Sequence, residues 1–370
     1  MQVKNKKNIS KIAFCLDAND FHGVDWAVKI HELIKNKQIL VISDTFNKVN
    51  LKIFKKNNIP FISLNKLNLF NPNNFTAFGN LKRNILKILW LPFCIYQLKK
   101  LLDKQKILIH AHSMFYIFLC ALAKASFIAT PMGSDVLVRP SQSLLYKLCC
   151  AWALKKAEII SVDSKELQNK ILTLCNKKSV LIQNGISTKE AFFFAKKNLK
   201  RNLLISPRAI DENYRIKNIL AARNGEKINR PITFFYPYYN LAYINQLQAL
   251  MIKNDKNIGR ITKQHMYFFF ARALVVFSIP LSDSSPRSIY EAIFCGAPIC
   301  TVDAKWVHDL PYCMQSRIII ADIKQSGWMT LAIHKAKKIC KIQFKPTPKA
   351  IKTYDEICSM KMAIELLYES

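Results

Sequence analysis

The stretch from 273 to 302 places the strongest limits on how this chain can fold. ALVVFSIP over 273–280 is a short apolar run typical of a buried strand. The Ser-Ser-Pro at 284–286 signals a helix start, Gly296 signals its end, and a second strand is expected over 298–302. The same alternation of strands and helices elsewhere in the chain predicts parallel sheets covered on both faces.

Two carboxylates bracket the turn between this strand and this helix. Asp283 lies in the loop, and Glu291 lies about two turns into the helix. A helix N-terminus that follows a strand can hold a phosphate group, because unpaired N–H groups and the helix dipole point outward there. An ordinary capped strand–helix–strand unit is the alternative.

The segment SDSSPRSIYEAIFCGAPI resembles the carboxylate-x7-Glu motif of retaining GT-B glycosyltransferases, especially family 4. It keeps Pro286, Glu291 and Gly296, but Asp283 stands where a glutamate is usual. The resemblance implies an α/β fold of two Rossmann-like domains that face each other across a cleft.

The length of the chain favours two domains, since 370 residues exceed the size at which one core usually stops growing. Periodicity is lost over 192–202, where we place the linker. The expected parts are an acceptor-binding domain over 1–190 and a nucleotide-sugar-binding domain over 201–352. A final helix within 353–370 is expected to cross back to the first domain, as in GT-B folds.

Three segments of the first domain resemble family motifs. HAHSMF resembles an H-x-H segment, which implies that His112 lies beside the donor sugar while His110 packs inside. PMGSD and the loop DANDFHG resemble segments at the cleft, which implies roles on the acceptor side for Gly133, Asp135 and Gly23. A structural role is the alternative for each of these residues.

In the second domain, the segment SPRAIDENYRIKNI resembles a donor-binding segment. The resemblance implies that Arg208 binds the donor diphosphate, helped by Arg215 or Lys217 and by the N–H groups of Arg287 and Ser288. It also implies that Glu291 binds the ribose and Asp283 the sugar hydroxyls. A surface charge is the alternative for Arg208.

The formal charge of +32 is extreme for a chain of this length. Either a solvated lysine-rich surface or an anionic partner can account for it. The segment 81–106 mixes apolar and basic residues around Pro92, which predicts either contact with an anionic membrane surface or a buried helix with basic ends. No recognisable motif predicts nucleic-acid binding.

Eleven cysteines without C-x-x-C pairs indicate buried thiols in a reducing compartment. The N-terminal sequence does not resemble a signal peptide, and no apolar run has the length of a membrane span. We therefore expect a cytoplasmic protein that can contact the inner face of the cytoplasmic membrane.

Together, the motifs predict a retaining glycosyltransferase that moves a sugar from a nucleotide-diphosphate donor to a glycan or lipid-linked glycan. The expected pathway is surface polysaccharide or glycolipid biosynthesis, and neither a cofactor nor a metal ion is expected. The alternatives are a GT-B-shaped sugar-nucleotide epimerase and a non-catalytic basic protein that binds anionic membrane or nucleic acid.

Overall fold

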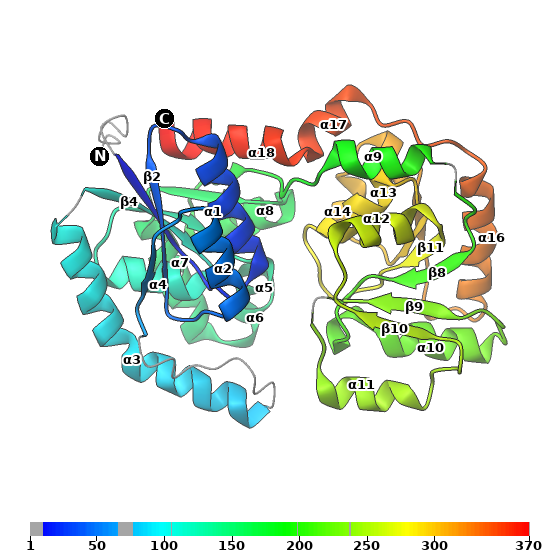
Figure 1. Ribbon diagram of the computed structural model, residues 1–370. Coiled ribbons are helices and arrows are strands. Elements are labelled where there is room, and N and C mark those ends of the chain that lie inside the picture. The colour runs from blue at the N-terminus through cyan, green and yellow to red at the C-terminus, as the bar shows by residue number, and fades with distance from the viewer. Residues whose placement is uncertain (1–9, 66–76, 105, 198, 237, 370) are drawn as a thin grey trace. The chain divides into compact units, whose positions relative to one another are not determined.

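The computed structural model describes residues 10–65, 77–104, 106–197, 199–236 and 238–369. The chain divides into two compact units, drawn in Figure 1. Unit 1 consists of Met1–Gln183 together with Met360–Ser370, and unit 2 of Asn184–Ser359.

Unit 1 is built on a seven-stranded sheet in the order β3-β2-β1-β4-β5-β6-β7. All neighbouring strands pair in parallel. The strands are β1 (Lys11–Cys15), β2 (Gln38–Ser43), β3 (Phe61–Ser63), β4 (Ile107–His112), β5 (Phe127–Thr130), β6 (Ile159–Val162) and β7 (Val180–Leu181). The helices are α1 (Phe21–Leu33), α2 (Lys48–Lys56), α3 (Ala77–Lys104), α4 (Met114–Leu122), α5 (Gly133–Leu137), α6 (Arg139–Gln142), α7 (Leu144–Lys156) and α8 (Lys165–Cys175).

Each face of this sheet has its own hydrophobic core. Side chains of α3, α4, α7 and α8 pack in one core. The other core contains α1, α2 and the C-terminal residues Met360, Ala363, Leu367 and Tyr368. These four residues belong to α18 (Glu356–Ala363) and to the π-helical turn η3 (Ile364–Glu369).

Unit 2 is built on a six-stranded parallel sheet in the order β10-β9-β8-β11-β12-β13. The strands are β8 (Leu203–Ser206), β9 (Ile232–Phe235), β10 (Lys256–Gly259), β11 (Ala273–Phe277), β12 (Ile299–Thr301) and β13 (Ile318–Ile320). The helical segments are α9 (Thr188–Lys196), η2 (Glu212–Tyr214), α10 (Ile216–Gly225), α11 (Leu241–Gln248), α12 (Lys263–Ala271), α13 (Arg287–Phe294), α14 (Lys305–His308), α15 (Tyr312–Gln315), α16 (Trp328–Cys340) and α17 (Pro348–Tyr354). The prediction of two Rossmann-like domains is confirmed.

The limits of the units differ from the expected 1–190, 201–352 and 353–370. The segment 192–202, expected as a linker, lies wholly in unit 2. Its first residues continue α9, whose Phe192 and Phe194 pack against the core of that unit. Aromatic packing therefore attaches this segment to the core of unit 2, although its lysines are typical of a linker.

Pro92 lies inside α3 without breaking the helix, although proline at such a position predicts a break or a kink. Among the described residues, no helix is long and apolar enough to cross a membrane.

Candidate functional site

Arg208 is fixed at the carboxyl end of the six-stranded sheet by three contacts within unit 2. It follows β8, and its Nη2 forms an ion pair with the carboxylate of Asp283, on the loop after β11. Its Nη1 donates a hydrogen bond of 3.1 Å to the Oγ of Ser288 in the first turn of α13. Its guanidinium carbon lies 4.3 Å from the centre of the Tyr214 ring. The structure thus brings together three of the residues assigned to the donor.

Arg208 is only 8% exposed, so it is not the surface charge that the alternative interpretation required. Burial opposes its charge, but Asp283 and Tyr214 raise its pKa above the usual value. Asp283, expected to bind sugar hydroxyls, is here the counterion of the arginine expected to bind the diphosphate.

Glu291 lies on the buried side of α13. It is 5% exposed and accepts a 3.1 Å hydrogen bond from the Tyr267 hydroxyl, while the Nζ of Lys263 lies 3.8 Å from the same oxygen. Burial raises the pKa of Glu291, although Arg287 and Lys263 lower it in part. Both cations also pair with Glu356, at 3.6 and 3.7 Å. Sequence reasoning missed Lys263, whose only signal is a basic side chain at the start of the helix that precedes β11.

Arg215 and Lys217 do not join this group. Both line a cavity of about 1050 Å³ on the side of α10, together with Asp303 and Asp322. Within the described part of the chain, no hydrogen bond or ion pair links them to Arg208. The backbone explains this, since Arg215 adopts a left-handed conformation (φ 50°) at the start of α10, directly after the tyrosine that stacks on Arg208.

His112, the last residue of β4 in unit 1, is buried among aromatic rings. The ring centre of Phe14 lies 5.8 Å away, that of Trp26 5.3 Å away and that of His110 4.3 Å away. Burial lowers the pKa of His112 to about 3, and His22 contributes, so its imidazole is neutral at physiological pH. Its Nε2 has no hydrogen-bond partner within the described residues. His110 packs inside, with its Nδ1 2.5 Å from the hydroxyl of Tyr368.

The three residues assigned to the acceptor side occupy local structural positions. Gly23 lies in the first turn of α1, where an added Cβ would lie 3.3 Å from the Cβ of Leu16. Gly133 is the first residue of α5. Asp135 accepts a 2.9 Å hydrogen bond from the N–H of Met114 at the start of α4, and it pairs with Arg139 at 2.9 Å. Asp135 therefore caps a helix, one of the two roles expected for it.

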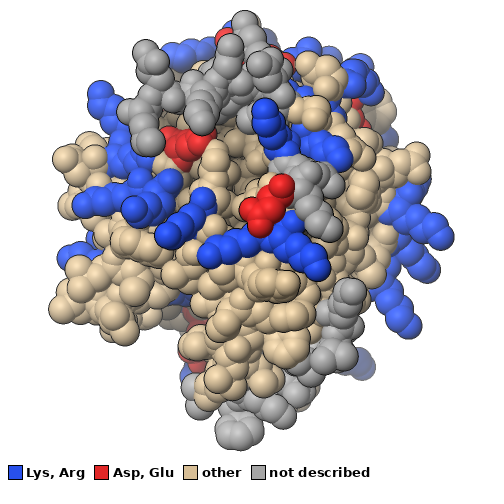
Figure 2. Space-filling model, turned by 90° about the vertical axis from the view of Figure 1, so that its left-hand side faces the viewer, with Lys and Arg blue, Asp and Glu red and all other residues tan. Residues whose placement is uncertain are grey.

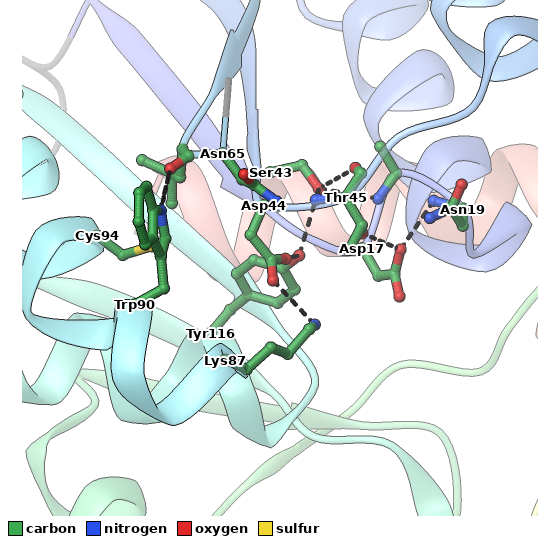
Figure 3. Close-up of polar contacts among 12 residues, drawn as sticks. Asp17, Asn19, Ser43, Asp44, Thr45, Asn65, Lys87, Trp90, Cys94 and Tyr116 are labelled. Atoms are coloured by element: carbon green, nitrogen blue, oxygen red, sulfur yellow. Dashed lines mark hydrogen bonds and ion pairs between the residues drawn. The ribbon is translucent and has the colours of Figure 1, made fainter. Parts of the chain in front are cut away.

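A second polar cluster, which sequence reasoning missed, follows the ends of β1, β2 and β3 in unit 1 (Figure 3). Asp44 is fully buried and accepts from the Tyr116 hydroxyl, while the Nζ of Lys87 on α3 lies 2.9 Å from its other oxygen. Asp17 accepts from the hydroxyl of Thr45. Polar residues directly after predicted strands were the available signal. Lys87, counted with the basic flank of 81–106, is in fact held by Asp44.

Comparison with protein families gives a match in unit 1. The family described as "Glycosyl transferase 4-like" matches residues 11–164. No curated protein matches the chain by sequence.

Comparison with solved structures shows the same fold over nearly the whole chain. HepE from Anabaena, in complex with UDP and glucose, has a TM-score of 0.71 at 13% identity, covering 98% of this chain and 100% of that one. Sucrose-phosphate synthase from Thermosynechococcus elongatus has a TM-score of 0.69 at 13% identity, covering 96% and 97%. UDP-GlcNAc 2-epimerase from Methanocaldococcus jannaschii has a TM-score of 0.57 at 11% identity, covering 97% and 100%.

The fold alone does not distinguish a transferase from an epimerase, because both kinds of enzyme share it. The match of residues 11–164 is to a glycosyltransferase family. The chain therefore has the GT-B fold, and its residues 11–164 are similar to the family 4-like glycosyltransferases, in agreement with the resemblance found in the sequence.

Proposed function

We propose that this enzyme transfers a sugar from a nucleoside-diphosphate donor to a hydroxyl of a membrane-anchored glycan, with retention at the anomeric carbon. UDP is the nucleotide we favour, since a structure with this fold, HepE, is a complex with UDP and glucose. The observation that carries the proposal is the buried Arg208 beside Ser288 at the start of α13.

The leaving diphosphate gains negative charge as the bond to the sugar breaks. A guanidinium and helix N-terminal N–H groups stabilise such charge when they are already in place. Arg208 and the N–H groups of Arg287 and Ser288 would supply both. When the diphosphate arrives, Arg208 would exchange part of its bond with Asp283 for phosphate oxygens, which releases that carboxylate toward the sugar hydroxyls.

Glu291 would accept hydrogen bonds from the ribose hydroxyls, as the motif implies. Lys263 and Tyr267 position its carboxyl group. Burial raises the pKa of this carboxyl group and so disfavours its ionised form. Hydrogen bonds from the ribose hydroxyls would favour the ionised form, because the carboxylate accepts them.

His112 would contact the donor sugar through its neutral ring, because the pKa of about 3 leaves no positive charge for it to contribute. We assign Asp135 to supporting the start of α4 and retain Gly23 and Gly133 as candidates for close backbone approach to the acceptor.

The acceptor is proposed to be a lipid-linked glycan or glycolipid of the cell surface, because α3 exposes apolar side chains next to lysines. The cytoplasmic location and the metal-free reaction stay predictions. Cell fractionation and turnover in the presence of a chelator check them.

Turnover of a panel of nucleotide sugars tests the proposal. Arg208→Ala and Glu291→Gln should each lower kcat/KM by more than about tenfold, which corresponds to roughly 1.4 kcal/mol of transition-state stabilisation. Lys253→Ala, an exposed cation just before β10, is the control and should keep full activity. Unchanged turnover in both site variants would exclude this site. Release of an isomerised nucleotide sugar without a glycosylated product would favour the epimerase.

A further inference from the structure

The outer face of α7 in unit 1 carries large apolar side chains that nothing in the described part of the chain covers. Leu144, Leu145 and Leu148 are 71%, 73% and 60% exposed, and Trp152 is 41% exposed. At 100° per residue these four positions span an arc of about 100° on the helix. The buried side of α7 consists of Cys150, Ala153 and Leu154. This helix therefore turns most of its large apolar residues outward and two of its smaller ones into the core.

The neighbouring helix α3 repeats this arrangement. Ile85, Ile88, Leu89, Phe93 and Tyr96 are between 42% and 70% exposed and recur with helical spacing along one side. Cys94 and Leu98 face the core instead. Both α3 and α7 pack on α4, on the same face of the seven-stranded sheet.

The charges around these stripes have one dominant sign. Lys147, Lys155 and Lys156 are exposed on α7, and the helix has no acidic residue. On α3 the exposed stripe continues into Lys99 and Lys100. On the surface that Figure 2 shows, the blue of lysine and arginine covers far more area than the red of aspartate and glutamate.

We propose that α3 and α7 together form the surface by which unit 1 docks on an anionic lipid bilayer. A monomeric protein rarely exposes a wide apolar patch without a partner. Helices with an apolar stripe flanked by lysines lie in the headgroup region of a bilayer. Their apolar side chains reach the boundary with the acyl chains, and their lysines contact the anionic headgroups. α7 has 13 residues, too few to span a bilayer, so it lies along the surface.

The ion pair between Lys87 and Asp44 links this surface to the carboxyl edge of the sheet. It ties α3 to the residue that follows β2, at 2.9 Å. The α3 part of the docking surface is thus linked to the end of the sheet where ligands bind in parallel α/β folds. The inference rests on the proposed function only for the nature of the acceptor, since docking itself is measured without any substrate.

Binding to vesicles tests this surface directly. The full-length protein should sediment with vesicles containing phosphatidylglycerol and much less with pure phosphatidylcholine, and high salt should weaken binding. Leu144→Ser/Leu148→Ser/Trp152→Ser should lower the partition coefficient at least about tenfold, because three apolar side chains no longer enter the lipid. The control pair Leu331→Ser/Ile342→Ser, 47% and 67% exposed on unit 2, should bind like the wild type.

Two further measurements distinguish insertion of α7 into lipid from a general loss of folding or activity. Adding anionic vesicles should shift the tryptophan emission of the wild type to the blue, and Trp152→Phe should lose most of that shift. Hydrolysis of UDP-sugar without an acceptor should be unchanged in the α7 triple variant, whereas Arg208→Ala impairs that reaction and keeps vesicle binding.

Equal vesicle binding by the α7 variant and the wild type would overturn the proposal. So would a dimeric wild type that becomes monomeric in the α7 variant with no change in vesicle binding, because α7 would then be a contact between copies. Failure of the donor chemistry alone, with docking intact, would reject the proposed function and leave this inference standing.

Discussion

Arg208 is nearly buried, and the carboxylate of Asp283 lies against it as its counterion. A buried ion pair contributes little net stability, but removing one partner leaves the other charge uncompensated. The aspartate at 283 stands where a glutamate is usual in the family that the motif resembles, and it pairs directly with the arginine. Asp283 therefore competes with the diphosphate for the same guanidinium.

Asp283→Asn should lower the free energy of unfolding by about 2 kcal/mol and tighten UDP binding severalfold, since Arg208 is left without its counterion. Sugar transfer should fall, because the carboxylate for the sugar hydroxyls is gone. Calorimetry with UDP and a thermal scan with and without UDP measure both effects. Asp303→Asn, which removes an exposed carboxylate after β12, should change neither quantity. Weaker UDP binding in Asp283→Asn would contradict the competition.

The sequence placed most site residues at the right strand ends, because side chains that follow parallel strands must meet at one edge. It could not predict which of them touch. The ion pair joins Arg208 to a residue 75 positions away, and the separation of Arg215 from both accompanies a left-handed backbone conformation at Arg215 itself. Lys263 and Asp44 escaped notice because each acts through a partner distant in sequence, Glu291 and Lys87 respectively.

At the scale of elements, α7 shows what periodicity can and cannot predict. It runs from Leu144 to Lys156. Its orientation was not predictable, because apolar residues occur all round the helix and either side could have faced the core. The same ambiguity left two interpretations of the segment 81–106. In the structure, α3 packs one apolar side on the core and exposes another.

The close approach of the backbone at Gly185 to the backbone at 354–356 gives a sharper test at this scale. The N–H of Ile186 donates to the carbonyl of Tyr354 at 2.8 Å, and the N–H of Glu356 donates back to the carbonyl of Ile186 at 2.8 Å. A Cβ at position 185 would lie 2.3 Å from the Cα of Glu356. The two backbone segments can therefore approach this closely only with glycine at that position.

Gly185→Ala should cost about 3 kcal/mol of stability, because backbone rather than a flexible side chain must move. Gly225→Ala is the matched control at the end of α10, where an added Cβ meets nothing within 4 Å. It should be neutral or stabilise by about 0.5 kcal/mol. Urea unfolding of both variants measures the difference in the free energy of unfolding. Equal stabilities would show that the two backbone segments at 185 and 356 can move apart without loss of stability.

At the scale of the whole molecule, the last described residues of the chain belong to the unit that contains the first. Tyr368 is fully buried, and its hydroxyl lies 2.5 Å from His110 in the middle of the seven-stranded sheet. The centre of the His110 ring in turn lies 4.3 Å from that of the His112 ring. The C-terminal segment thus contributes to the core that also holds the neighbour of the histidine that we assign to the sugar.

Substitutions at Leu367 and at its neighbour Leu366 test whether the C-terminal segment stabilises the core of unit 1. Leu367 is fully buried in the core of unit 1, whereas Leu366 is 36% exposed. Leu367→Ala should therefore lower stability by roughly 2–4 kcal/mol, and Leu366→Ala by less than about 1 kcal/mol. Hydrogen exchange should show lost protection in β1 and β4, which lie far away in sequence, with unit 2 unchanged. If protection instead falls in unit 2, or equally in both variants, the C-terminal segment does not complete the N-terminal core.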